Sequence, residues 1–445
     1  MFIVYVKALV SAGLCGWVAL LLWQRPAITR LLQTRQLPWL AIFYTVLRLV
    51  PFIVTYLILN YKPQSDVDGY YYPIATSAKN LGLVYRDVYS PYAPFFGYWL
   101  SIPLRLWQDT RMIVLALTLL ELAAVWLTVR EFAPSRLLSI PKSLDNQDII
   151  STTPDMDKGD RLFRALIYFS LPVPFVMCVF SGQEDVGLWL LALWAVATWQ
   201  RRGSPFWGGV LLALGLLSTK AVFIFIIIPL FFVATWRQKV PLVAGMAALG
   251  LPVLVFLYLN VGMLFIEQPL DEGDYLKAPN WRSLLNPFIS GLIPANGGIY
   301  KWLTLLTTVV VLVGVALRYR RNRPLAEATG LLFVLAFGLM TVMQQNAVSN
   351  YAYLFMLPLL FTLADFNKVG WWVGLLGFNA LAAIHPSLWW RMGMPYYKGL
   401  EMFGKPLSLL EYSMEILLLA GFVGYAWQAG RRLTMTNEQL PSINK

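Results

Sequence analysis

Long apolar segments separated by short polar ones recur along the whole chain of 445 residues. Many of them approach the roughly 20 residues that a helix needs to cross a hydrocarbon core of about 30 Å. They lack the short alternating strands of a membrane barrel. The pattern therefore predicts an all-α polytopic membrane protein. About thirteen transmembrane helices are expected, at residues 2–23, 38–60, 110–130, 162–180, 186–200, 205–219, 221–236, 240–261, 299–317, 325–343, 351–364, 369–385 and 407–428.

The composition agrees with this class, because 58% of the residues are hydrophobic and only 13% are charged. Soluble domains carry about 25% charged residues. A net charge of +12 could suggest nucleic-acid binding, but the basic residues lie mainly in short loops between apolar segments. That distribution is typical of the positive-inside rule for membrane proteins. We therefore expect membrane lipids, and no nucleic acid, as partners of the chain.

The basic loops predict a topology. They lie at 25–35, 200–203, 237–239, 318–323 and 430–432. Alternating spans place all of them on one side, which the positive-inside rule makes cytoplasmic. The N-terminus is then outside and the C-terminus inside, and the polar segment 141–161 is a cytoplasmic loop. The short loops favour the plasma membrane of a bacterium as the location of this multi-pass protein.

One apolar segment does not fit the alternation as a span. Residues 92–107 contain Pro94, Pro103 and Arg105, and counting them as a span would place 25–35 opposite the other basic loops. We expect a juxtamembrane or re-entrant helix that enters from outside and does not cross. The larger outer segments are then 61–109, 262–298 and 386–406.

The first outer segment contains two carboxylates, Asp66 and Asp68, followed by a dense set of tyrosines that includes Tyr70, Tyr85 and Tyr89. Carboxylates at this position could simply mark the end of a span, and tyrosines are common at membrane interfaces. Aromatic rings beside carboxylates also suit sugar recognition. Arg86 lies within the same segment.

Two further polar sites interrupt apolar segments on the predicted outer side. The stretch SGQEDVG contains Gln183, Glu184 and Asp185, whose carboxylates could alternatively complement a helix dipole. Lys220 stands alone between apolar runs, where an ionisable residue is a functional candidate or a snorkelling side chain. Later outer segments add the candidates Arg282, His385 and Arg391.

Metal chemistry has little support in the sequence. His385 is the single histidine, which excludes a histidine-rich metal cage, and Cys15 and Cys178 lie inside apolar segments as packing residues. Asp66 and Asp68 could hold magnesium or manganese through oxygen ligands. We expect no metal and no other cofactor.

The order of these features resembles the GT-C superfamily of membrane glycosyltransferases, in particular its mannosyltransferase branch. In that branch an Asp-x-Asp-type motif, followed by tyrosines and a G-x-x-Y…Y-x-P run, lies in the first outer loop. Here Asp66 and Asp68 are followed by GLVYRDVYSPYAP at 82–94. A Gly-Gln turn is matched by Gly182 and Gln183, and an outer lysine of the family by Lys220.

The resemblance covers about residues 38–236 and implies a catalytic core there with its outer loop at 61–109. Residues 1–37 would be an additional helix and basic loop, and residues 237–445 a variable C-terminal region with outer loops 262–298 and 386–406. The two acids of SGQEDVG depart from relatives, which often have amides or small residues at these positions.

The resemblance also implies a function: transfer of a sugar, mannose by the branch, from a polyprenyl-phosphate donor to a lipid, glycan or protein acceptor, with inversion, at the extracytoplasmic face. Asp66 or Asp68 would be the base, and Lys220 would contact the donor phosphate, with Arg282 or Arg391 completing a clamp. Tyr70, Tyr85 and Tyr89 would shape the sugar pocket. The alternatives are a transporter or flippase of a lipid-linked sugar and a GT-C-type ligase or polymerase. Nothing in the sequence marks a partner subunit.

Overall fold

The computed structural model describes residues 2–35, 37–133, 156–289, 298–319 and 323–435. Within these ranges the chain is a bundle of helices, and one isolated bridge pairs Val84 with Val88. The fold class predicted from the sequence, an all-α membrane protein, is confirmed. Most of the predicted cytoplasmic loop at 141–161, and residues 290–297 of the second large outer segment, lie outside the described residues.

Helices occupy all the predicted spans. The longer ones are α1 (Phe2–Trp23), α7 (Thr110–Glu131), α9 (Lys158–Ser170), α11 (Val186–Arg202), α12 (Pro205–Ser218), α13 (Ile224–Val233), α14 (Trp236–Val261), α17 (Gly298–Leu317), α18 (Leu325–Met343), α19 (Ala352–Thr362), α20 (Val369–Arg391) and α21 (Pro406–Thr434). The 38–60 span is a stack of α3 (Trp39–Tyr44), η1 (Thr45–Leu49), α4 (Val50–Phe52) and η2 (Ile53–Ile58). The 162–180 span is α9 followed by α10 (Pro172–Phe175) and η4 (Val176–Phe180).

Among the described residues, seven helices are long and apolar enough to cross a membrane. An eighth is added if α9 and the α10–η4 segment, which meet at a bend of 60°, form one span. A break after Ser170, where Pro172 opens the next helix, accounts for this bend. The predicted number of about thirteen spans is therefore not confirmed, because α11, α12, α13, α19 and α20 are not among these candidates.

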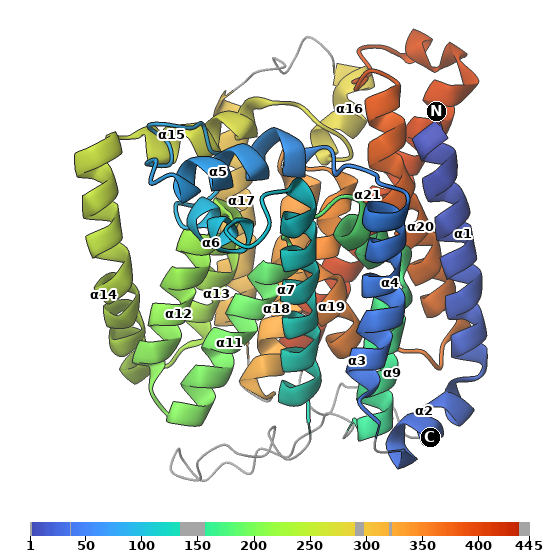
Figure 1. Cartoon of the computed structure of the whole chain (residues 1–445), viewed down its shortest axis with the longest axis horizontal. Helices are drawn as coiled ribbons and strands as arrows, with labels where there is room; N and C mark the ends of the chain where they lie inside the picture. The colour runs from blue at the N-terminus through green and yellow to red at the C-terminus, as the bar shows by residue number, and fades with distance from the viewer. Residues whose placement is uncertain (1, 36, 134–155, 290–297, 320–322, 436–445) are drawn as a thin grey trace.

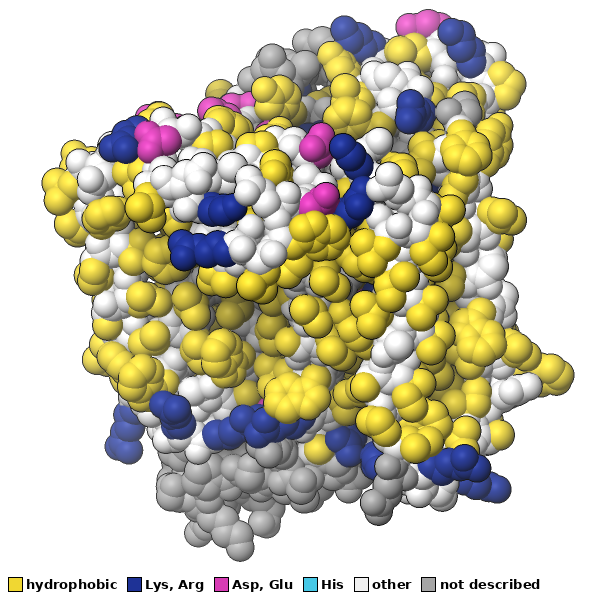
Figure 2. All heavy atoms as spheres, viewed as in Figure 1, with side chains coloured by type: hydrophobic (Ala, Val, Ile, Leu, Met, Phe, Trp, Pro, Cys, Tyr) yellow, Lys and Arg dark blue, Asp and Glu magenta, His cyan; other side chains and the backbone are white. Residues whose placement is uncertain are grey.

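The outside of the bundle is apolar across its middle. Figure 2 shows hydrophobic side chains over this belt, with Lys and Arg gathered at the lower end and Asp and Glu, beside other basic residues, at the upper end. Helix α18 is almost wholly enclosed by its neighbours, whereas α14 and α17 expose most of their apolar residues. An apolar exterior around an apolar core is what a lipid environment requires.

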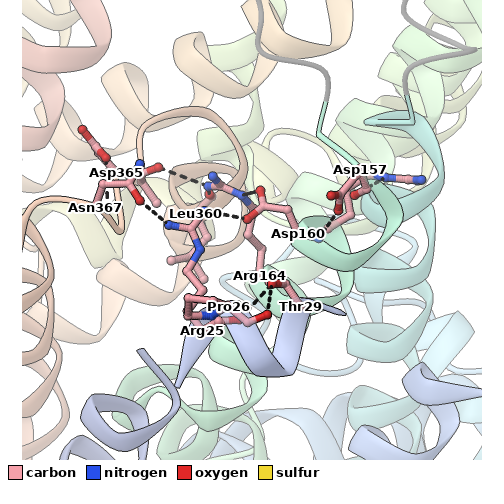
Figure 3. A network of polar contacts seen from close by, with 11 residues as sticks. Arg25, Pro26, Thr29, Asp157, Asp160, Arg164, Leu360, Asp365 and Asn367 are labelled. Carbon is pink, nitrogen blue, oxygen red and sulfur yellow. Dashed lines mark hydrogen bonds and ion pairs between the residues drawn. The ribbon is translucent and has the colours of Figure 1, made fainter. Parts of the chain in front are cut away.

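The lower end contains a network of ion pairs. Arg25, on α2 (Arg25–Thr34), lies 3.1 Å from Asp160 and donates to Asn367 Oδ1 at 2.8 Å. Asp160 also binds Arg164 at 2.7 Å, so three segments far apart in sequence meet here (Figure 3). The start of α1 lies at the opposite end of the bundle from α2 (Figure 1).

Short helices cover the upper end (Figure 1). These are η3 (Val67–Tyr71), α5 (Tyr72–Lys79), α6 (Phe96–Leu104), α15 (Leu264–Asp271), η6 (Glu272–Asp274), α16 (Trp281–Ile289), η7 (Ser349–Tyr351) and η8 (Leu400–Gly404). Helix α6 is only about 14 Å long at 1.5 Å per residue, too short to cross a hydrocarbon core. The segment 92–107 therefore contains a short, non-crossing helix, as predicted.

Helices α12 and α14 approach closely at two glycines. A Cβ on Gly209 would collide with the carbonyl oxygen of Leu242, and a Cβ on Gly245 with that of Phe206. Small residues at a crossing allow two backbones to come together, which is a common way for membrane helices to associate. This crossing attaches the otherwise peripheral α14 to the bundle.

Candidate functional site

Three polar segments predicted from sequence meet at the upper end of the bundle. Asp66 lies directly before η3, Gln183, Glu184 and Asp185 lie in the turn between η4 and α11, and Lys220 lies in the turn between α12 and η5 (Ala221–Phe223). Gly182 makes the approach possible, because it adopts a left-handed φ of +57° and a Cβ there would lie 2.6 Å from Val67 Cγ2. Glycine alone adopts this conformation without cost and leaves room for η3.

The centre of the site is a buried group of charges. Lys220 Nζ lies 2.8 Å from Glu184 Oε1 and 2.6 Å from Asp185 Oδ1. Glu184 and Asp185 are 1% and 0% exposed, and Tyr71 donates a hydrogen bond to Glu184 Oε2. One lysine therefore faces two carboxylates, which leaves the group with a net negative charge when all three are ionised.

The ionisation of this group is shifted by its surroundings. Burial raises the pKa of Asp185 to about 6; the nearby Lys220 lowers it and the charge of Glu184 raises it. For Lys220, burial lowers the pKa, but the attraction of Asp185 and Glu184 outweighs burial and raises the pKa well above its usual range. The lysine is therefore charged at neutral pH, and the pKa of Asp185 lies close to neutral pH.

Aromatic rings enclose the lysine. Its Nζ lies 5.8 Å from the centre of the Tyr92 ring and 5.7 Å from that of Tyr351. Tyr92 also packs edge-on against Tyr71, with ring centres 5.1 Å apart, and stacks on Phe96 at 4.6 Å. Such cation–π contacts stabilise a buried ammonium group.

The two aspartates of the first outer segment have different environments. Asp66 is partly exposed and accepts a hydrogen bond of 2.9 Å from Gln183 Nε2, at the edge of the buried charges. Asp68 lies on η3 and is exposed. The structure thus brings Asp66, Gln183, Glu184, Asp185 and Lys220 together and leaves Asp68 apart from them.

A second lysine borders the same space. Lys277 Nζ lies 3.3 Å from Glu272, and its backbone N–H donates to the Gln345 carbonyl at 2.8 Å. Burial raises the pKa of Tyr70, and the charges of Glu272 and Asp66 raise it further. Tyr70 therefore lies between Asp66 and Glu272, and its ring centre is 6.3 Å from that of Tyr92.

Other predicted residues support the loop and do not face the charges. Tyr85 is buried and donates to the Tyr92 carbonyl at 2.6 Å. Tyr89 donates to the Gln268 carbonyl at 3.2 Å, which ties the first outer segment to α15. Arg86 forms an exposed ion pair of 2.8 Å with Asp87.

The late candidates lie elsewhere. Arg282 is buried on α16, where it donates to Gln345 Oε1 and lies over the Tyr300 ring at 5.1 Å. Arg391 is exposed at the end of α20. His385 is fully buried within a different cluster. Arg282 bonds to the same residue as Lys277, Gln345, whereas the structure brings neither His385 nor Arg391 to Lys220.

Sequence reasoning missed two members of the site, Lys277 and Tyr351, as site residues. The signal for Tyr351 was the polar break between α18 and α19, which places it on η7 beside Lys220. Lys277 lies within a run of mixed charges in which no single residue stands out.

Two spans carry charged residues deep within the bundle. Arg48 and Glu121 are both fully buried and form a two-contact pair, Nε to Oε2 at 2.6 Å and Nη2 to Oε1 at 3.0 Å. Phe169 and Phe175 pack on the guanidinium group, 5.1 and 5.6 Å from it. The cost of burying each charge is offset by the partner and by these hydrogen bonds.

Comparison with known proteins supplies no relative for this chain: no protein-family model matches it, and no curated protein matches it significantly.

Proposed function

We propose that this chain is a membrane glycosyltransferase that uses a polyprenyl-phosphate sugar, with mannose as the first candidate, and works at the outer membrane face. The observation that carries the proposal is the position of Asp66. Its carboxylate is partly exposed, oriented by Gln183 Nε2 at 2.9 Å, and lies beside tyrosines and buried charges. A positioned carboxylate of this kind can act as a general base.

The reaction is a single displacement. The acceptor hydroxyl oxygen attacks the anomeric carbon while the bond from that carbon to the phosphate oxygen breaks. The acceptor proton moves to Asp66, and polyprenyl phosphate leaves with the bonding electrons. Attack from the face opposite the phosphate inverts the anomeric configuration. The negative charges around Asp66 would also stabilise positive charge that develops on the sugar ring.

We assign the donor phosphate to Lys277 instead of Lys220. Lys220 is already paired with two carboxylates at 2.8 and 2.6 Å, so a phosphate there would meet a net negative charge. Lys277 is paired with one carboxylate at the longer distance of 3.3 Å. Lys220 then acts as a positioning residue that holds Glu184 and Asp185.

A cavity of about 280 Å³ between the first outer segment and α14 would accept the start of the lipid tail. Its lining is almost entirely apolar and consists of Leu83, Val84, Pro94, Phe95, Tyr98, Val253, Phe256 and Leu257. Mostly apolar pockets with a few polar groups nearby are typical of ligand sites. The exposed flank of α14 lies next to lipid, which supplies a lateral route into the cavity.

A transporter of a lipid-linked sugar is the second candidate, because the Arg48–Glu121 pair places charge deep within two spans. Both groups are fully buried and paired with each other, which favours a structural role. A ligase or polymerase that uses His385 and Arg391 is less well supported, since one is buried and the other is exposed.

The test is sugar transfer by the purified protein in liposomes that contain polyprenyl-phosphate mannose. We expect Asp66→Asn to lower the transfer rate by about 10²- to 10⁴-fold, the usual contribution of a general base. Asp68→Asn, two residues away and exposed, is the matched control and should retain most of the activity. Lys277→Met should raise the KM for the donor more than it lowers kcat.

Equal loss in the two aspartate variants would contradict the assignment of the base to Asp66. No turnover with mannose, glucose or arabinose donors, together with movement of a lipid-linked sugar across the same liposomes, would replace the enzyme proposal with the transporter.

A further inference from the structure

A second buried polar cluster lies on α20 and α21, apart from the site around Asp66. It contains His385, Glu411 and Glu415, whose ligand atoms all lie within 4.8 Å of one another. His385 Nε2 is 2.9 Å from Glu411 Oε1. The three residues are at most 1% exposed.

The local structure aims these side chains at one point. Glu411 and Glu415 are one helical turn apart on α21, so they share the face that packs on α20. Hydroxyl groups hold the other atoms of the cluster. Ser349 Oγ is 3.1 Å from His385 Nδ1, Tyr397 donates to Glu411 at 2.8 Å, and Ser283 donates to Glu415 at 2.7 Å. Such contacts fix the orientation of metal ligands in known sites.

The charge of this cluster is not balanced by protein groups. Every other buried carboxylate of the described residues contacts an arginine or lysine: Glu121 with Arg48, Glu131 with Arg201, Glu184 and Asp185 with Lys220, and Glu327 with Arg323. Glu411 pairs with the His385 imidazole, Glu415 accepts a hydrogen bond from Ser283, and one imidazole is the basic group close to both carboxylates. Buried carboxylates without compensating charge are costly, so a cation or a proton must be present between them.

We propose that His385, Glu411 and Glu415 bind a divalent transition-metal ion of the zinc or manganese class. One imidazole nitrogen with two carboxylates favours such ions over calcium and magnesium, which prefer sets of oxygen ligands. A metal site of this kind needs only one histidine when carboxylates supply the other ligands. The ion would connect α20 to α21 and, through Ser283, hold α16 against them. This inference does not depend on the proposed glycosyl transfer.

The experiment measures metal bound to the detergent-purified protein by inductively coupled plasma mass spectrometry, after purification on a tag that does not use a metal resin. We expect about one zinc or manganese ion per chain, and loss of at least three-quarters of it in His385→Ala and Glu411→Gln. Glu401→Gln, an exposed glutamate on η8, is the control and should retain the ion.

Glu415→Gln separates the metal from a shared proton, because glutamine has the shape of a protonated glutamate. With a metal, this variant loses the ion and its Tm falls by several degrees; with a shared proton, its Tm stays at the wild-type value. Chelation of the wild type should lower the Tm, and added zinc or manganese should restore it. Absence of bound metal together with a Tm that neither chelator nor metal changes would overturn the proposal, as would magnesium or calcium as the bound ion.

Discussion

At the scale of residues, the site depends on which partner each carboxylate contacts. Lys220 satisfies Glu184 and Asp185, Tyr71 donates to Glu184, and Gln183 orients Asp66. Each carboxylate therefore has a different environment. Asp66 remains the one with solvent access, which is what a base that exchanges protons with an acceptor requires.

Asp185 makes the stability of this group depend on pH. Its pKa is about 6 in the folded protein and near its ordinary value of 3.8 when unfolded. The folded state binds the proton more tightly, so the contribution to stability is complete below about pH 4 and is lost as pH rises through 6. We expect the free energy of unfolding of the wild type, relative to Asp185→Asn, to fall by up to about 3 kcal/mol between pH 4 and 7, at about 1.4 kcal/mol per pKa unit.

Thermal unfolding of both proteins in detergent, followed by tryptophan fluorescence at several pH values, measures this difference. Titratable groups that do not interact with Asp185 cancel in the comparison. A difference that is constant with pH would show that folding does not shift the pKa of Asp185.

At the scale of elements, glycines decide how closely helices and turns approach. Gly182 brings η3 to the turn before α11, and Gly209 and Gly245 bring α12 to α14. In both places, backbone positions depend on the absence of a side chain. The geometry around Asp66 is therefore a property of packed elements and not only of the residues that carry the chemistry.

Gly182→Ala tests this dependence, with Gly203→Ala as its matched control. Both glycines have φ near +60°, but a Cβ on Gly203 meets nothing within 4 Å, whereas one on Gly182 meets Val67 and Val114. We expect each substitution to cost about 1–2 kcal/mol of stability for the left-handed conformation. Only Gly182→Ala should also displace η3 and lower sugar transfer by at least tenfold. Equal activities in the two variants would show that the position of η3 tolerates this change.

At the scale of the whole molecule, charge is distributed between two ends separated by an apolar belt (Figure 2). The loops predicted to be cytoplasmic correspond in part to α2 and the first turn of α14, and the candidate site lies at the other end. This separation leads to a prediction of sidedness, since positively charged loops stay in the cytoplasm.

Single cysteines at Leu81 and Arg237, both exposed, report the two ends once Cys15 and Cys178 are replaced by alanine. In intact cells, a membrane-impermeant maleimide should label Leu81→Cys and should label Arg237→Cys only after the membrane is opened. Labelling of both positions from outside would remove the basis for an extracytoplasmic site.

Much of the fold could be predicted from the apolar pattern, because a segment in lipid must form its backbone hydrogen bonds internally and therefore folds as a helix. The positions of the helices and the short helix within 92–107 could be predicted in this way. The lengths of α12, α13 and α19 could not; α19, for example, is enclosed by protein and need not match the membrane thickness. Similarly, the Arg48–Glu121 pair joins two spans that no local pattern relates.

The candidate site was predicted as a set of segments more accurately than as a set of residues. Asp66 and Asp68 were expected together, but Asp66 precedes η3 and accepts a hydrogen bond from Gln183, whereas Asp68 lies on η3 and is exposed. Lys277 and Tyr351 reach the site by tertiary packing of the later outer segments, which spacing along the chain does not reveal.

Helix α14 crosses α12 closely, and a tilt of α14 about this crossing would change the width of the apolar cavity that Leu257 lines. Gly245 lies at the crossing, and Leu257, on the cavity wall, is about 18 Å further along the same helix at 1.5 Å per residue. A tilt of about 5° at the crossing would move that wall by roughly 1.6 Å over this length. The width of this cavity, which we propose receives an isoprenoid chain, thus depends on backbone packing in the other half of α14.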